Sequence, residues 1–267
     1  MPFVQTNGIR LAYQRSGRGE PVLMIMGSGA GGHVWALNQT PALHQAGYQT
    51  VVFDNRGIAP SDAPAGKYSL ADVVADTRGL IAGLDLAPCR IVGISLGAMI
   101  AQELAIQDPG LVRCAVLIAT RARSDAARQA LQAADVALLE SGVLLPPAYK
   151  AAATAFRMLS PSTLNDDAAV RPWLDLFELS GGSDGTADGQ TWIDAAEDRR
   201  AALRAVTAPC RVIAFEDDVI TPLHLAAEVA EAIPDCDLIR IRDCGHLGHL
   251  ERPDDLNAAI IEFLSRH

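Results

Sequence analysis

The stretch GISLG, residues 93–97, constrains the fold of this chain more than any other. An apolar run with β-forming residues leads into it, and a helical pattern of small residues follows it. A serine at such a strand-to-helix turn has a strained backbone, and a Cβ two positions before or after it would clash with the neighbouring strand and helix. The Gly-x-Ser-x-Gly spacing therefore predicts a sharp turn that raises the Ser95 hydroxyl above the end of a strand.

Apolar runs of strand length, including the one before GISLG, occur along the chain and are separated by segments with helical spacing. Each run is typical of a strand buried on both faces, and the alternation predicts a mostly parallel β-sheet covered by helices on both faces. Asn7-Gly8, between two runs of alternating polarity, predicts a β-hairpin before this sheet. The runs are residues 21–26, 50–53, 90–94, 112–119 and 210–215.

The strand pattern is interrupted after the sixth predicted strand. Residues 121–206 are alanine-rich, carry scattered charges and have no convincing buried strand, and the pattern of strands and helices returns after them. We therefore expect a core domain formed by residues 1–120 and 207–267, with residues 121–206 inserted as a helical cap. In open α/β sheets the site lies at the carboxyl ends of the strands, so the cap is expected to cover that edge.

Composition excludes several classes of partner. The 267 residues carry a formal net charge of −10, which argues against a nucleic-acid partner, and no run of Lys or Arg suits an anionic membrane. No apolar stretch approaches the roughly 18–20 residues of a membrane-spanning helix, and the N-terminus does not resemble a secretory signal. The five cysteines lack a CxxC spacing, which favours free thiols and a cytoplasmic location. We expect a small-molecule substrate, and a homodimer remains open.

A serine becomes a nucleophile when a base lies within hydrogen-bond reach and a carboxylate orients that base. Two loops that follow predicted strands late in the chain supply candidates for both groups. The first loop carries Glu216, Asp217 and Asp218, and the second region carries His246 and His249. The order serine, acid, histidine is the one that a hydrolase sheet of this kind uses. The residues alone leave the choice within each loop open.

At this point the sequence resembles the α/β-hydrolase superfamily, in its lidded esterase and cofactor-free haloperoxidase-like branch. The resemblance runs nearly from end to end, although Met26 stands where the family usually has a histidine. Its carriers are Met26-Gly27-Ser28 after the third strand, FDNRGIAPSD at 53–62, GISLG at 93–97, FEDDVITP at 215–222 and CGHLGHLERP at 244–253. It implies an α/β-hydrolase fold with a helical cap inserted after the sixth strand.

The resemblance also assigns roles to individual residues. It implies that Ser95 is the nucleophile, His246 the general base and acid, and Asp218 the residue that orients the histidine. It places the oxyanion hole at the backbone N–H groups of Leu96 and Ser28. Donors of this kind act because they are fixed before charge develops on the substrate.

For the substrate pocket we expect contributions from a histidine after the glycine loop and from aromatic residues of the cap, with packing inside the cap as the alternative for the aromatic residues. These residues are His33, Phe156, Trp173, Phe177 and Trp192. His249 is expected to serve in packing or to lie at the surface.

The predicted function is that of a serine hydrolase that cleaves a carboxylic ester, lactone or thioester of a small organic molecule through an acyl-enzyme, without a metal or cofactor. One alternative is a non-hydrolytic catalyst on the same fold, such as a cyclase or lyase in a biosynthetic pathway. Another is a cofactor-free haloperoxidase or perhydrolase, which would use the same three residues. A distant alternative is a dinucleotide-binding protein, because GSGAGG at 27–32 matches G-x-G-x-x-G and Asp54 follows the next strand.

Overall fold

The computed structural model describes residues 1–180, 188–193 and 197–267. The strands are β1 (Phe3–Thr6), β2 (Ile9–Gly17), β3 (Pro21–Ile25), β4 (Gln49–Phe53), β5 (Cys89–Ile94), β6 (Val112–Ile118), β7 (Cys210–Phe215) and β8 (Cys236–Ile241). The α-helices are α1 (Gln39–Gln45), α2 (Leu70–Gly83), α3 (Leu96–Gln107), α4 (Ala126–Ser141), α5 (Pro147–Met158), α6 (Pro161–Leu164), α7 (Asp167–Ser180), α8 (Arg200–Leu203), α9 (Leu223–Ala232), α10 (Gly248–Glu251) and α11 (Pro253–Leu264). Short 3-10 helices are η1 (Gly32–Leu37), η2 (Pro109–Leu111) and η3 (Asp188–Trp192).

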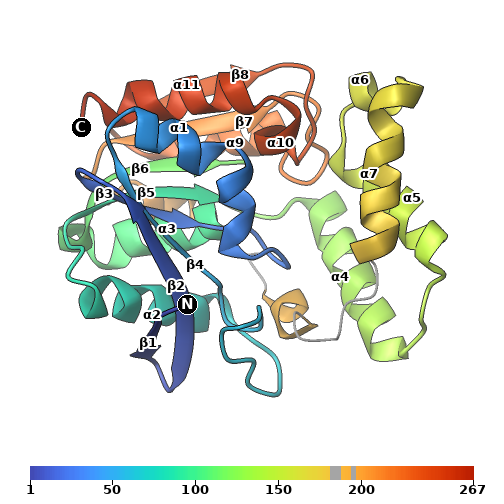
Figure 1. Ribbon diagram of the computed structural model, residues 1–267, viewed down its shortest axis with the longest axis horizontal. Coiled ribbons are helices and arrows are strands. Elements are labelled where there is room, and N and C mark those ends of the chain that lie inside the picture. The colour runs from blue at the N-terminus through green and yellow to red at the C-terminus, as the bar shows by residue number, and fades with distance from the viewer. Residues whose placement is uncertain (181–187, 194–196) are drawn as a thin grey trace.

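The eight strands form one sheet in the order β1-β2-β4-β3-β5-β6-β7-β8 (Figure 1). The strands β1, β2 and β4 pair antiparallel, and every pair from β4 to β8 is parallel. The predicted hairpin is present between β1 and β2, where Asn7 and Gly8 both have positive φ. The prediction of a mostly parallel sheet with a hairpin at its start is confirmed.

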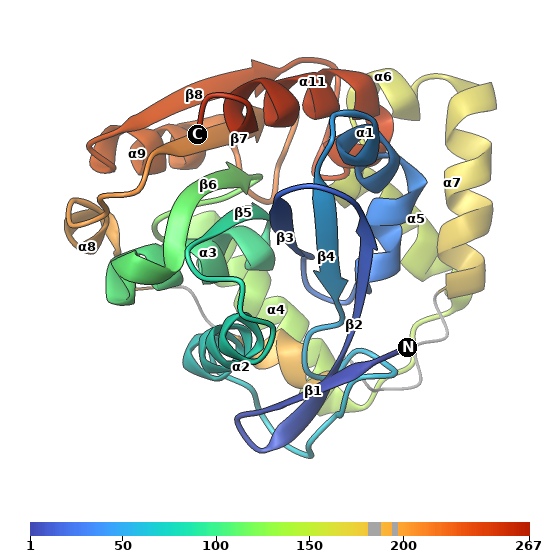
Figure 2. The same ribbon diagram turned by 60° about the vertical axis from the view of Figure 1, so that its left-hand side comes forward.

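Both faces of the sheet are buried, which explains the continuous apolar runs. Along β3, Leu23 and Ile25 belong to a core cluster with α2, α3 and α9, whereas Val22 and Met24 belong to a second cluster with α1 and α11. Figure 2 shows α1 and α11 on one face of the sheet and α2 and α3 on the other. Because successive side chains of a strand point to opposite faces, consecutive positions of such a strand are mostly apolar.

The turn between β5 and α3 has the strained geometry that the sequence predicts. Ser95 lies there with φ 54° and ψ −116°, and its N–H donates to the carbonyl of Ile118 at 2.9 Å. A Cβ on Gly97 would lie 2.1 Å from the carbonyl oxygen of Ile25, and one on Gly93 would lie 2.4 Å from the carbonyl oxygen of Gly97. These contacts are with backbone that cannot move aside, so both glycines are required for β5 and α3 to meet at this angle.

Where the structure describes the chain between β6 and β7, it contains helices and connecting loops but no strand. The helices α4, α5, α6 and α7 gather to one side of the sheet (Figure 1), whereas α8 packs against α3 and α9 and buries Leu203 in the core. The range 121–206 that the sequence suggests as a cap therefore includes α8, which lies within the helical layer of the core. Residues 181–187 and 194–196 of that range lie outside the described residues. Among the described helices, none combines the length and apolar character needed to cross a membrane.

Candidate active site

Three side chains from three distant parts of the chain meet beyond the carboxyl ends of the strands. Ser95 follows β5, Asp218 lies in the loop after β7, and His246 lies in the loop after β8. The Nε2 atom of His246 is 3.1 Å from the Oγ of Ser95, and its Nδ1 atom is 2.7 Å from Oδ2 of Asp218. The structure thus brings together the serine, histidine and acid that the sequence suggests, and it selects Asp218 and His246 from the open alternatives by distance.

The carboxylate of Asp218 is buried and fully provided with donors. The backbone N–H groups of Ile220 and Thr221 donate to its Oδ1 at 2.7 and 2.9 Å, and the Thr221 hydroxyl donates to Oδ2 at 2.6 Å. Burial raises the pKa of this carboxyl, but the nearby His246 and the hydrogen bonds from His246 and Thr221 outweigh it and hold the pKa below its ordinary value. Asp218 is therefore ionised at neutral pH.

An ionised carboxylate can only accept hydrogen bonds. The Nδ1 atom of His246 must therefore carry the proton in its bond to Asp218, which leaves Nε2 as an acceptor for the hydroxyl of Ser95. This tautomer is the one in which the imidazole can remove a proton from the serine.

The loop that carries His246 is held by the carboxylate of Glu251, which lies five residues further along the chain in α10. Glu251 accepts from the N–H of Gly245 at 2.7 Å and from the N–H and hydroxyl of Ser160, which precedes α6, at 3.0 and 2.8 Å. The N–H of Leu247 also donates to the carbonyl of Met158 at the end of α5. The position of the imidazole thus depends on contacts with the helices between β6 and β7.

The loop after β3 passes beside Ser95. A Cβ on Gly27 would lie 3.3 Å from the Cβ of Ser95 and 3.8 Å from its Oγ. Ser28 follows on the cavity wall, and on the other side of Ser95 the residue Leu96 begins α3, where backbone N–H groups have no partner within the helix. The two N–H groups suggested for an oxyanion hole thus belong to segments that flank the serine.

Three side chains hold the loop after β3 in place. The Asn55 amide donates to the carbonyl of Met26 at 3.2 Å, and the N–H of Gly29 donates to Oε1 of Gln190 at 2.8 Å. At its end, the carboxylate of Asp54 accepts from the N–H of Gly32 at 2.8 Å and is only 5% exposed. The carboxylate that a dinucleotide site would offer to a ribose is therefore used to fix the glycine loop.

A cavity of about 770 Å³ opens above Ser95 and His246. Its base comes from the strand ends and the loop after β3, and its upper wall comes from α4, α5 and η3. The upper wall mixes apolar side chains with charged ones, namely Leu131, Asp135, Leu138, Leu139, Lys150, Arg157, Met158, Asp188, Gln190, Thr191 and Ile193. A cavity of this size accommodates a small organic molecule.

The five residues suggested for the substrate pocket lie elsewhere. Phe156 is 73% exposed, His33 is exposed after the glycine loop, and Trp173 packs against Phe177 with ring centroids 5.7 Å apart. Trp192 lies over the ammonium group of Lys67. None of the five is among the described residues that line the cavity. Helical periodicity shows that an aromatic residue lies on a face, but only the packing of the helices decides which face turns toward the site.

His249 lies on the cavity wall but forms no hydrogen bond through its ring within the described residues. Its side chain packs against Trp35 with ring centroids 6.0 Å apart, and the residue is 1% exposed. Burial, together with the nearby His246, lowers the pKa of His249 to about 3. His249 is therefore a neutral packing residue at pH 7, as the sequence suggests, and also part of the cavity wall.

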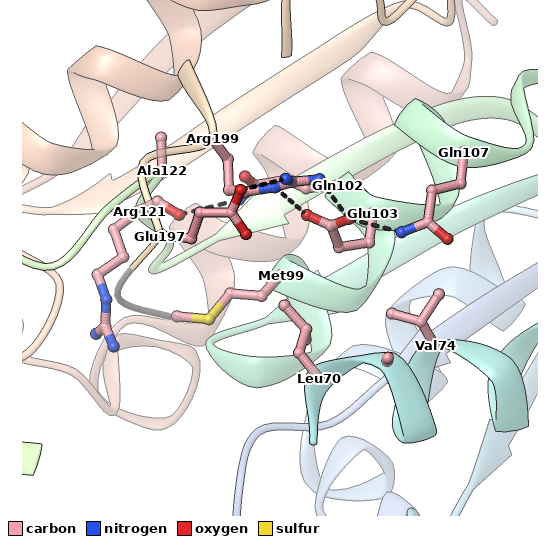
Figure 3. Close-up of a pocket in the computed structure, with 11 residues that line it drawn as sticks. Leu70, Val74, Met99, Gln102, Glu103, Gln107, Arg121, Ala122, Glu197 and Arg199 are labelled. Carbon is pink, nitrogen blue, oxygen red and sulfur yellow. Dashed lines mark hydrogen bonds and ion pairs between the residues drawn. The ribbon is translucent and has the colours of Figure 1, made fainter. Parts of the chain in front are cut away.

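A second, smaller cavity of about 270 Å³ lies on the far side of Met99 and shares Met99 and Arg121 with the main one. Figure 3 shows Arg199 lying across Glu103 of α3, with Gln107 at one end and Met99 and Leu70 beneath. Arg199 and Glu103 form two hydrogen bonds of 2.7 and 2.8 Å, and Gln107 donates to the same carboxylate. These polar groups already satisfy one another, whereas Ser95 and His246 line the larger cavity.

Sequence reasoning missed several residues that shape the site. Thr221 and Glu251 lie within the motifs at 215–222 and 244–253, so their position close in sequence to Asp218 and His246 was a usable signal. Gln190 had no such signal, because it lies outside the recognised motifs, in the helical region, and reaches the loop after β3 only through folding.

Comparison with known proteins identifies the family and agrees with the fold. A family model described as the alpha/beta hydrolase fold matches residues 20–253. A Mycobacterium tuberculosis protein with the provisional name non-heme bromoperoxidase BpoC is 45% identical over 259 residues, which are 96% of this chain and 98% of the relative. Its crystal structure has a TM-score of 0.92 to this structure at 44% identity and 96% coverage of each chain. The 3-oxoadipate enol-lactonase 2 of Acinetobacter baylyi is 26% identical over 97% of this chain and 94% of its own length.

Replacement of His249 by leucine is expected to reduce the loss of stability in acid. The folded-state pKa of about 3 lies below the ordinary value of 6.5, so the unfolded chain binds the additional proton, and stability is lost as pH falls from about 6.5 toward 3. Between pH 7.5 and pH 5 this one group accounts for about 2 kcal/mol of lost unfolding free energy. Urea unfolding at the two pH values measures the difference.

The exposed His224 provides the control, since its side chain is 60% exposed and its ion-pair contact with Asp125, at 3.4 Å, lies at the surface, where such pairs contribute little. His224→Leu is expected to leave the difference between pH 7.5 and pH 5 within about 0.5 kcal/mol of the wild type. If His249→Leu loses as much stability in acid as the wild type does, the buried neutral histidine is not a source of acid sensitivity.

Proposed function

The chain belongs to the α/β-hydrolase family, and we propose that within this family it is a serine hydrolase that cleaves a carboxylic ester, lactone or thioester. The observation that carries the proposal is the hydrogen-bonded series from Asp218 through His246 to Ser95, with distances of 2.7 and 3.1 Å, at the base of a cavity. The relatives named as an enol-lactonase and as a bromoperoxidase are compatible with it.

In the first half of the proposed reaction, the Oγ of Ser95 attacks the substrate carbonyl while Nε2 of His246 takes the hydroxyl proton. The ionised Asp218 stabilises the imidazolium that forms. The negative charge on the carbonyl oxygen is held by the N–H groups of Leu96 and Ser28. His246 then returns the proton to the leaving alcohol or thiol as the C–O or C–S bond breaks, which leaves an acyl group on Ser95.

In the second half, His246 removes a proton from a water molecule, whose oxygen attacks the acyl carbon. The tetrahedral intermediate collapses, Ser95 regains its proton from His246 and the carboxylic acid leaves. We propose residues 121–206, apart from α8, which packs in the core, as the cap of this site. The helices α4 and α5 supply much of the cavity wall and so limit the size of the acyl and alcohol groups.

A second candidate is perhydrolysis, which the name of the 45% identical relative favours. Hydrogen peroxide would replace water in the second half, give up a proton to His246 and attack the acyl carbon, so that a peracid leaves instead of a carboxylic acid. Adding peroxide to the ester assay and measuring peracid against carboxylic acid distinguishes the two. If a fluorophosphonate labels Ser95 but the protein turns over no ester, lactone or thioester, this result would instead favour a lyase or cyclase.

Ser95→Ala is expected to lower kcat by about 10⁶-fold, because removal of the nucleophile leaves only binding and electrostatic stabilisation. The measurement is hydrolysis of p-nitrophenyl esters of increasing chain length, with lactones and thioesters in parallel, together with fluorophosphonate labelling followed by mass spectrometry. A variant that keeps its esterase activity and its label would exclude Ser95 as the nucleophile.

Asp218→Asn is expected to lower kcat by about 10⁴-fold, because an amide in place of the carboxylate no longer fixes the tautomer of His246 or stabilises its charged form. The neighbouring Asp217 serves as the matched control, since among the described residues it is Asp218, not Asp217, that bonds to the histidine ring. Asp217→Asn should stay within about threefold of the wild type. A large loss in the Asp217 variant together with a small one in the Asp218 variant would reassign the acid.

A further inference from the structure

We propose that Gln190 is a positioning residue, which fixes the oxyanion-side loop after β3 from the helical region between β6 and β7. The inference rests on the proposed function and extends it, because it makes part of the cap necessary for the geometry of the reaction. Gln190 lies in η3 and reaches the core of the molecule across more than 130 positions of sequence.

The amide group of Gln190 joins two loops of the core. Its Oε1 accepts from the N–H of Gly29 at 2.8 Å, and its Nε2 donates to the carbonyl of Arg56 at 2.8 Å. One partner is a donor and the other an acceptor, so the amide orientation is fixed by its contacts. The residue is 4% exposed and lies on the wall of the cavity, so water competes poorly for these bonds.

The point to which Gln190 is attached is itself rigid. The Arg56 guanidinium forms a buried two-bond ion pair with Asp76 of α2, with distances of 2.6 and 2.7 Å, and lies over the ring of Tyr68. Both side chains of the ion pair are less than 10% exposed. A loop tied to this carbonyl through Gln190 is therefore tied to the helical layer of the core.

The segment η3 that carries Gln190 is also seated firmly. The N–H of Tyr68 donates to the carbonyl of Gly189 at 3.1 Å, and a Cβ on Gly189 would lie 2.5 Å from the Tyr68 ring. From the other side, Gln132 of α4 donates to the carbonyl of Thr191 at 2.6 Å. Gln190 is thus held in position between α4 and the core.

The loop needs such a contact at Gly29. Asn55 holds its beginning and Asp54 its end, and among the described side chains only Gln190 bonds to its middle. Gly29 has φ +73°, and no atom lies within 4 Å of the position that a Cβ would take, so neither a side chain nor close packing restrains it there. It directly follows Ser28, whose N–H is the proposed oxyanion donor, and a donor displaced by about 1 Å can cost about 10²-fold in rate.

The test uses Gln190→Met in the full-length protein, a change that keeps the length of the side chain and removes both hydrogen bonds. We expect kcat for p-nitrophenyl esters to fall by about 10- to 100-fold with KM changed by less than about threefold. The affinity for a trifluoromethyl ketone, which forms an oxyanion on Ser95, should fall by a similar factor as kcat/KM. A residue with only a structural role would lower the amount of folded enzyme and leave these constants unchanged.

Hydrogen–deuterium exchange tests the contact without relying on activity. The Gly29 amide should exchange at least about fivefold faster in Gln190→Met than in the wild type, whereas amides of β5 should be unchanged. Gln190→Glu keeps an acceptor for this amide, so its exchange should stay slower than in the methionine variant. If Gln190→Met does not fold, Gln190→Leu serves in its place, because it also removes both hydrogen bonds.

Gln129→Met is the matched control. Among the described residues, the side-chain amide of Gln129 in α4 bonds only to the carbonyl of Ser124, and Gln129 is not part of the cavity lining. This variant should match the wild type in both measurements. Unchanged exchange at Gly29 in Gln190→Met would overturn the proposal whatever the enzyme's substrate. Faster exchange at Gly29 with unchanged kcat would also overturn it. The proposed function is judged separately: it stands as long as the esterase activity depends on Ser95.

Discussion

The imidazole of His246 forms two hydrogen bonds, and the arrangement of the site depends on both being made at once. One reaches the buried carboxylate of Asp218 and the other reaches the hydroxyl of Ser95. For this to happen, three loops that follow β5, β7 and β8 must end at one edge with an accuracy of a few tenths of an ångström. A parallel sheet provides that accuracy, because all its strands present their carboxyl ends on the same side and its faces are fixed by packed helices.

The local geometry of the turn makes this convergence possible at Ser95. The close approach of α3 to the end of β3, which only glycine at position 97 permits, brings the serine between the start of the helix and the loop that carries Ser28. The strained backbone of Ser95 is stabilised by surrounding contacts, including the bond from its N–H to β6. Strain at such a position persists only where the neighbouring structure over-determines it.

The segment between β6 and β7 lines the cavity and also holds two loops of the site in place. The end of α5 and the start of α6 bond to the loop that carries His246, directly and through Glu251, and η3 bonds to the loop that carries Ser28. Both halves of the proposed machinery, base and oxyanion donor, are therefore supported from the same inserted region. A change of substrate preference by mutation in α4 or α5 must preserve these contacts if the reaction geometry is to survive.

Much of the fold was readable from the sequence, because short-range rules govern it. Apolar runs bounded by turn residues predicted β3 to β7, Asn7-Gly8 predicted the hairpin, and the glycines around Ser95 predicted the turn. The motifs also brought Asp218 and His246 forward as partners of the serine. In each case the signal lies within a few residues of the position concerned, where backbone sterics and periodicity act.

Tertiary structure alone decided which side chains face the cavity and what holds its loops. The aromatic residues suggested for the pocket, such as Trp173 and Phe177, pack against one another away from it, whereas Gln190 and His249 lie on its wall. A helix pattern fixes which residues share a face, but the direction of that face follows from contacts with distant segments. The bond from Gly29 to Gln190 joins residues 161 positions apart. A local sequence pattern cannot predict a contact between segments so far apart in the chain, because only the packing of the whole fold brings them together.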